Sequence, residues 1–113
     1  MNDEAGVVTV SAPPSVGKVL AGALVESRAA ACVQIIPGVQ SVYWWKGQVQ
    51  TDEEVLLVAK TLKSKLPDIE AILKKMHPYE LPELVFLPIQ GGLAEYLEWI
   101  QASAGGKNPE GKH

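Results

Sequence analysis

The feature that most constrains this chain is a long run of strand-forming residues that folds back on itself once. Residues 31–60 divide into two arms at Lys46-Gly47, a pair that favours a tight hairpin turn because glycine stands second. Each arm is roughly twice the length of a typical strand of about 5–6 residues. At about 3.3 Å per residue, one arm would reach roughly 45 Å. A hairpin of that length extends beyond its own domain.

The outer part of this hairpin is apolar and aromatic. It contains Val42, Tyr43, Trp44, Trp45 and Val49. Leaving such a surface in water is costly and promotes aggregation. We therefore predict that the hairpin packs against a neighbouring copy and that the protein is an oligomer.

The periodicity of apolar residues predicts a β-α-β-β-α-β order with one more helix appended. That order is the split βαβ or ferredoxin-like pattern, an α+β fold with a four-stranded antiparallel sheet and two helices on one face. We expect a single domain over residues 1–103 and a disordered tail over 104–113, which is rich in glycine and lysine. The predicted strands cover residues 7–12, 31–45 with a break at Pro37-Gly38, 48–60 and 84–89; the predicted helices start after Pro13-Pro14-Ser15, cover 64–76 and lie within 93–100.

Composition and charge exclude several classes of protein. The net charge of −3 and the absence of basic clusters mean that the sequence lacks the basic surface that binds nucleic acid. No apolar run approaches the about 20 residues that span a bilayer, so we expect no membrane association. A single cysteine, Cys32, rules out an internal disulfide and fits a reducing compartment. The acidic start argues against a targeting peptide, so we expect a cytoplasmic protein, or an organellar one if a transit peptide has been removed.

The segment from His77 to Glu83 has the densest cluster of side chains that could bind a ligand or a metal ion. It reads His-Pro-Tyr-Glu-Leu-Pro-Glu and supplies an imidazole, a phenol and two carboxylates on a path stiffened by prolines. Imidazole nitrogen and carboxylate oxygen are ligands that zinc and copper accept. The spacing alone does not distinguish a metal site from a polar turn that leads out of a helix.

The chain carries four motifs: residues 28–38, 41–47 with 51–54, 77–83 with 87–89, and 96–99. Together, from Val7 to Trp99, they resemble the CutA family, the divalent-cation tolerance proteins. The resemblance implies a ferredoxin-like fold and a homotrimer in which long hairpins wrap adjacent subunits, an architecture shared with the PII signalling proteins. It also implies a role in tolerance to copper and other divalent cations.

The chain departs from the ligand pattern of some bacterial members. Those members place a cysteine at the position of Ser11 and a second histidine at the position of Met76, and their proposed copper ligands include the histidine that matches His77. Here His77 is the strong ligand, and Met76 offers a thioether to Cu(I). We predict a metal site formed by Met76, His77, Glu80 and Glu83, in which copper or another divalent cation is not required for folding. The alternative is that His77 merely ends a helix.

A second candidate site is a pocket between subunits. Tyr79, Trp45, Lys60 and the acidic residues 52–54 could converge there, and strand alternation puts Asp52 and Glu54 on one side. The alternative is that the aromatic residues are interface contacts, as aromatics often are. The predicted interface or inter-subunit pocket consists of Tyr43, Trp44, Trp45, Lys60 and Tyr79.

Catalysis has little support in the sequence. Cys32 lies in an apolar run without a neighbouring histidine, and the glycines fit no known phosphate loop. We predict a non-catalytic homotrimer that binds divalent cations such as copper and confers tolerance to them. The alternative is a trimeric scaffold, or a PII-like signalling or ligand-binding module, without a specific metal role. The expected partners are further copies of the chain and a divalent metal ion.

Overall fold

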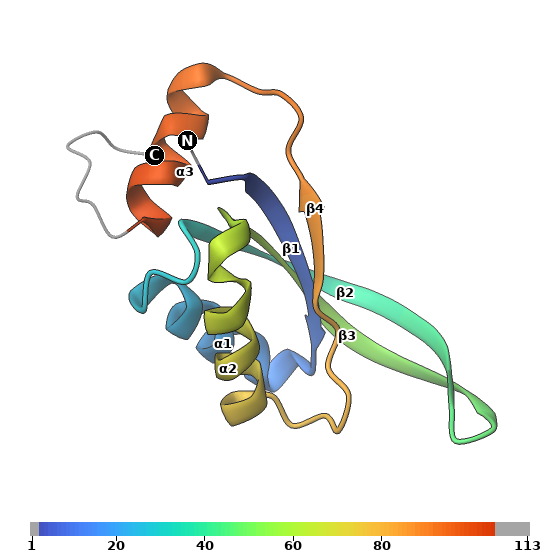
Figure 1. Ribbon diagram of the computed structural model, residues 1–113. Coiled ribbons are helices and arrows are strands. Elements are labelled where there is room, and N and C mark those ends of the chain that lie inside the picture. Colours follow the sequence, from blue (N-terminus) through green and yellow to red (C-terminus); the bar gives the residue numbers. More distant parts are fainter. Residues whose placement is uncertain (1–2, 106–113) are drawn as a thin grey trace.

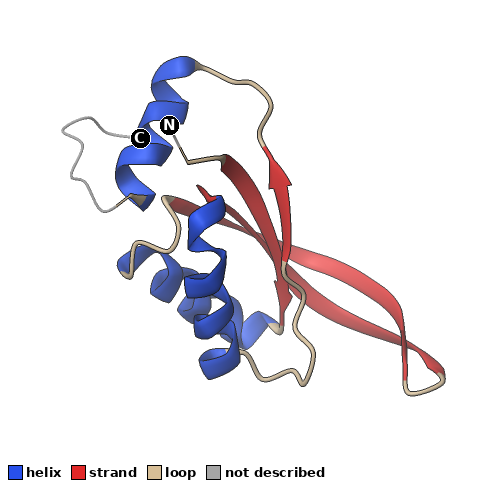
Figure 2. Ribbon diagram, in the orientation of Figure 1, coloured by secondary structure: helices blue, strands red, loops and turns tan. Residues whose placement is uncertain are grey.

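The computed structural model describes residues 3–105, and it has the predicted ferredoxin-like order with a third helix. Four antiparallel strands form one sheet in the order β2-β3-β1-β4. Helices α1 and α2 cover one face of this sheet, and α3 lies at the end near the N-terminus (Figure 1, Figure 2). The elements are β1 (Ala5–Ala12), α1 (Pro14–Glu26), β2 (Cys32–Trp45), β3 (Gln48–Leu62), a 3₁₀ turn η1 (Lys63–Lys65), α2 (Leu66–Met76), β4 (Val85–Pro88) and α3 (Ala94–Ala104).

The main hydrophobic core lies between the sheet and helices α1 and α2. Alternate residues of β1 point into it because side chains of a strand alternate between the two faces of a sheet. Helix α1 packs close to β3 at Gly17, where an added Cβ would lie 2.5 Å from a methyl of Val55. Fully buried members of this core include Val8, Val10, Ala12, Leu20, Leu24, Leu57 and Ile69.

The helix boundaries follow local sequence signals, with one correction at the C-terminal end. Pro78 lacks an N–H and therefore stops α2 at Met76. Helix α3 runs to Ala104, which is fully buried beside Ile100, so the predicted tail begins too early by at least this residue. Residues 106–113 of that predicted tail lie outside the described residues. Among residues 3–105, no helix is both long and apolar enough to cross a membrane.

The long hairpin is present as predicted and projects from the domain as an arm (Figure 1). Strands β2 and β3 have 14 and 15 residues, and the molecule measures 47 × 25 × 24 Å. Lys46 and Gly47 both have positive φ (52° and 79°), as a tight hairpin turn requires. The pairing shifts register between Ile36 and Val39, at the predicted break. We use "the arm" for residues 39–54, the part of the hairpin beyond this shift.

Candidate functional site

The segment that connects α2 to β4 is held by His77. Its ring is buried, with Nε2 2.8 Å from the carbonyl oxygen of Ser11, and Nδ1 accepts the backbone N–H of Tyr79 at 3.2 Å. A ring nitrogen that accepts a hydrogen bond carries no proton, so Nε2 must carry it and donate to Ser11. Neither nitrogen then has a lone pair free for a metal ion. In this arrangement His77 fixes the 77–84 segment to the end of β1.

The four predicted metal ligands do not converge within one chain. The side chain of Met76 packs against the hydrophobic core, and Glu83 accepts a 2.7 Å hydrogen bond from the Thr9 hydroxyl. Glu80 is exposed and lines a different recess from Glu83. Across residues 3–105, no three His, Cys, Asp or Glu side chains are grouped so as to hold a metal ion. The residues of a single chain therefore do not fit a resident metal centre.

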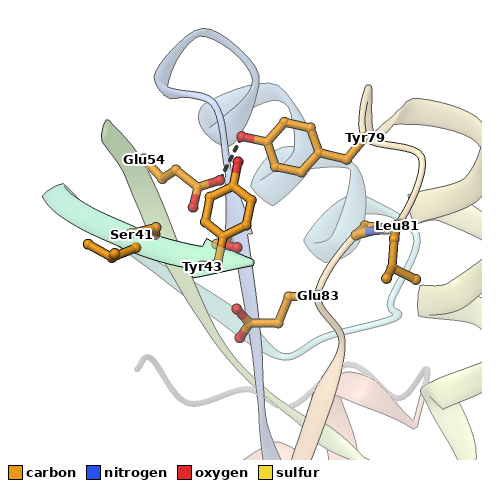
Figure 3. A pocket seen from close by; sticks show the side chains of 9 residues that line it. Ser41, Tyr43, Glu54, Tyr79, Leu81 and Glu83 are labelled. Atoms are coloured by element: carbon orange, nitrogen blue, oxygen red, sulfur yellow. Dashed lines mark hydrogen bonds between the residues drawn. The ribbon is translucent and has the colours of Figure 1, made fainter. Parts of the chain in front are cut away.

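A pocket of about 620 Å³ lies between the base of the arm and the segment after α2 (Figure 3). Hydroxyl and carboxylate groups supply most of its polar lining, and apolar side chains complete it. Figure 3 shows the Tyr43 ring of β2 and the Tyr79 ring of the 77–84 segment converging on Glu54 of β3. The lining residues are Ser11, Ser41, Val42, Tyr43, Glu54, Tyr79, Leu81, Pro82 and Glu83.

Glu54 is the most unusual group in this pocket. Only 4% of the Glu54 surface is exposed. Burying a carboxylate costs free energy unless the group is hydrogen-bonded. The hydroxyl of Tyr79 donates to Glu54 Oε2 at 2.6 Å. Burial and this carboxylate raise the pKa of Tyr79 well above its usual value of 10, so the phenol keeps its proton. The pair joins the arm to the 77–84 segment.

A smaller recess of about 220 Å³ adjoins the pocket and shares Tyr43, Tyr79 and Leu81 with it. Trp45 and Glu80 complete its lining. The hydroxyl of Tyr43 donates to the carboxylate of Asp52. This hydrogen bond, followed by burial, raises the pKa of Tyr43 above 10. We call this cavity the aromatic recess.

The structure brings together only part of the pocket predicted from the sequence. Tyr43, Trp45 and Tyr79 line the aromatic recess, and Tyr43 and Tyr79 line the adjoining pocket together with Glu54. Lys60 is absent from both linings, and its ammonium donates to Gln34 Oε1 at 2.7 Å. Trp44 and Trp45 alternate along β2 and therefore point to opposite faces of the arm, so Trp44 lies away from the aromatic recess.

Sequence reasoning also missed functional groups in this pocket. Alternation indicated that Asp52 and Glu54 share a side, but nothing in the sequence showed that Glu54 is buried. The hydroxyls of Ser11 and Ser41 were not predicted to line a pocket, because they come from strands that only the fold brings near the 77–84 segment.

A model of the CutA1 divalent ion tolerance protein family matches residues 6–103. The chain belongs to this family. It is 49% identical over 98 residues to a chloroplastic CutA 1 protein of rice, covering 86% of this chain and 55% of the rice protein. It is 45% identical over 100 residues to the divalent-cation tolerance protein CutA of Thermus thermophilus, covering 88% and 97%. The chain thus spans about half the length of the rice relative and nearly all of the bacterial one.

Solved CutA structures share the fold. The crystal structure of rice CutA1 superposes with a TM-score of 0.86 at 47% identity, covering 90% of this chain and 94% of that one. A CutA of Nostoc described as PII-like has a TM-score of 0.81 at 33% identity, covering 88% and 96%. The recognition of the family and of its fold from the sequence is confirmed.

Proposed function

We propose that this CutA family member acts as a non-catalytic homotrimer in divalent-cation tolerance, with its pocket completed by a neighbouring subunit. The observation that carries this proposal is the uncovered apolar face of the arm. Trp44 is 74% exposed, and Val42 and Val49 are 66% and 57% exposed. These three side chains share one face, because Trp44 pairs with Val49 and Val42 lies two positions before Trp44.

An oligomer explains this exposed surface better than a monomer does. An apolar surface rimmed by polar residues is typical of a protein–protein contact. The projecting arm can reach a second copy, and a closed ring would cover the arm of each subunit in the same way. The projecting arm and the membership of the CutA family support the trimer. The pocket lies at the base of the arm, where a neighbouring copy would supply the missing wall.

The trimer is tested by light scattering on the wild type and on a double variant of the arm. We expect the wild type to have three times the 12.1 kDa mass of one chain. Trp44→Glu with Val49→Glu should lower the mass by placing charges on the contact face. The matched control is Val19→Glu with Val25→Glu, two exposed residues on α1, which should leave the mass unchanged. A wild type that runs as a single chain would refute the trimer.

The carboxylates of the pocket support the cation part of the proposal. Glu54 and Glu83 line the same cavity, and each has one oxygen beyond the one named in its hydrogen bond. Two carboxylates are fewer than the four ligands of a closed zinc site. The cation is therefore cargo of the assembled protein, with further ligands from a second subunit or from water. Glu80 and Met76 remain proposed ligands only through such an assembly.

Isothermal titration with Cu(II), Cu(I) and Zn(II) tests this assignment. We expect Glu83→Gln to weaken binding, and Glu95→Gln, an exposed glutamate in the first turn of α3, to have no effect. His77→Ala should keep binding in the folded fraction, because both ring nitrogens are already hydrogen-bonded. Loss of binding in His77→Ala together with full binding in Glu83→Gln would overturn the assignment and restore His77 as the ligand.

A second candidate is a PII-like module that binds a small ligand without a specific metal role. The hydrogen bonds of His77 favour this candidate. Both ring nitrogens already have a protein partner, so the residue expected to be the strongest metal ligand has no nitrogen left for a metal ion. The likeness to the PII-like CutA of Nostoc supports it as well. Metal binding no tighter than that of the Glu83→Gln variant would favour this candidate. For either candidate we propose a reducing, cytoplasmic setting, which the free thiol of Cys32 supports.

A further inference from the structure

We propose that the aromatic recess binds the methylated ammonium head of a small organic cation. Tyr43 and Trp45 from β2 form one side of this 220 Å³ cavity, and Tyr79, Glu80 and Leu81 from the 77–84 segment form the other. Nothing in the divalent-cation role accounts for three aromatic side chains around one cavity. The ligand would be a molecule such as a quaternary amine.

The aromatic walls give the first reason. A cation within about 6 Å of an aromatic ring centroid is attracted by the negative face of the ring, and tryptophan provides the strongest attraction. Trp45 already has such a neighbour in its own chain, since the Lys46 ammonium lies 5.9 Å from the ring centroid. The ring is thus exposed enough for a positively charged group to approach it.

The charges around the recess give the second reason. Glu80 lies in the wall, and each phenol donates to a further carboxylate, Tyr43 to Asp52 and Tyr79 to Glu54. Hydrogen bonding to a carboxylate adds electron density to a phenol ring and makes its face more attractive to a cation. Three carboxylates therefore act on this cavity, against one nearby ammonium, that of Lys46 beside Trp45.

The chemistry of the walls selects an organic cation over a bare metal ion. Ring carbons and the Leu81 side chain offer no lone pairs, and Glu80 is the one carboxylate in the lining. A divalent ion that lost its water here would therefore regain too few oxygen ligands. A methylated ammonium is weakly hydrated and has an apolar surface with a diffuse positive charge. Recognition of such groups by aromatic cages is a known use of this arrangement.

The recess is formed by one chain, although it shares Tyr43, Tyr79 and Leu81 with the pocket that the proposed trimer would complete. All five lining residues come from the same chain, and Trp45 is on the opposite face of the arm from Trp44. The face that would contact a neighbour is the one with Val42, Trp44 and Val49. Failure of the trimer would leave this inference standing, and its own failure would leave the trimer standing.

Nuclear magnetic resonance of the tryptophan indole N–H groups provides the test. The chain has three tryptophans, so each serves as a control for the others. Choline chloride should shift the Trp45 signal in a saturable way, whereas Trp44 and Trp99 should hardly move. The neutral isostere 3,3-dimethylbutan-1-ol has the same shape without the charge, and potassium chloride matches the ionic strength. Both should leave the Trp45 signal unshifted.

Variants then separate charge from packing. Glu80→Gln should weaken choline binding by about fivefold, the equivalent of about 1 kcal/mol for one favourable charge contact. Trp45→Leu should abolish binding, and Trp44→Leu should leave it unchanged. An equal response to choline and to the neutral isostere in the wild type, or equal shifts of all three indoles, would overturn the proposal. The wild-type comparison holds even if Trp45→Leu fails to fold.

Discussion

The hydroxyl of Tyr79 is 2.6 Å from the carboxylate of Glu54, a residue 25 positions earlier in the chain that is almost completely buried. This hydrogen bond links the base of the arm to the segment that leaves α2. It also supports both cavities of the site, because Tyr79 lines the pocket and the aromatic recess alike. The two cavities should therefore respond together to changes at this pair.

Removing the Tyr79 hydroxyl should destabilise the protein. Tyr79→Phe leaves the buried Glu54 carboxylate without this donor, and an unsatisfied buried group costs about 1–3 kcal/mol, with charged groups at the upper end. Tyr43→Phe is the matched control, because it removes a hydroxyl that also donates to a carboxylate but lies at an exposed position. Urea unfolding at one fixed protein concentration measures both. An equal loss of unfolding free energy in the two variants would contradict the special role of the buried Tyr79–Glu54 pair.

His77→Ala should loosen the 77–84 segment. The substitution removes a hydrogen-bond partner from the Ser11 carbonyl and from the Tyr79 N–H, at a cost of about 1–3 kcal/mol for each group left buried and unsatisfied. Hydrogen exchange at the Tyr79 amide should become faster, while the amides within α1 keep their relative protection. Unchanged exchange at Tyr79 would show that His77 does not hold this segment.

Two glycines in the same helix should respond to alanine in opposite directions. At Gly17 an added Cβ would lie 2.5 Å from a Val55 methyl, so Gly17→Ala should destabilise by about 1–3 kcal/mol through overpacking. At Gly22 no atom lies within 4 Å of the added Cβ, so Gly22→Ala should stabilise by about 0.5–1 kcal/mol through helix propensity. Thermal unfolding of both variants checks the sign. A loss of stability in Gly22→Ala would mean that this face of α1 is covered by another chain.

Stability should fall with rising pH above about pH 10. Burial, and then a contact with the Cys32 thiol, raise the pKa of Tyr96 from 10 to about 12. The unfolded chain therefore loses this proton first, so the contribution of Tyr96 is complete below pH 10 and disappears as the pH rises to about 12. Tyr43 and Tyr79 act in the same direction.

Tyrosinate absorbance measures this directly. The native protein should titrate above pH 10 and the protein in concentrated urea near pH 10, and Tyr96→Phe should make the fall in stability shallower. A native titration at or below pH 10 would contradict the raised pKa values.

Local signals were sufficient for the fold. The Lys46-Gly47 turn, the break at Pro37-Gly38 and the proline after α2 are each determined by backbone preferences of one or two residues. The length of β2 and β3 could be predicted because the apolar and β-branched residues continue through both. The end of α3 at Ala104 was missed because the burial of this small residue depends on Leu62 and Ile100, which pack against it.

The candidate site could be predicted only in part, because its groups meet through the fold. His77 was singled out as a ligand, but its hydrogen bond joins it to Ser11, 66 positions away, and only the fold brings the residue after α2 beside the end of β1. Glu54 belongs to an acidic run that is typical of a solvated surface. Its burial requires the 77–84 segment to cross the base of the arm, which no local pattern encodes.

Strand β1 has both of its neighbours far downstream in the chain. Val8 pairs with Ala59 on one side and with Phe86 on the other. The first strand leaves the ribosome long before either partner exists, so the sheet cannot close until β4 has been synthesised. Closing such long loops before their contacts are gained slows folding. This topology therefore predicts that the sheet forms late, once β4 is available, and that folding is slower than that of a helical protein of equal length.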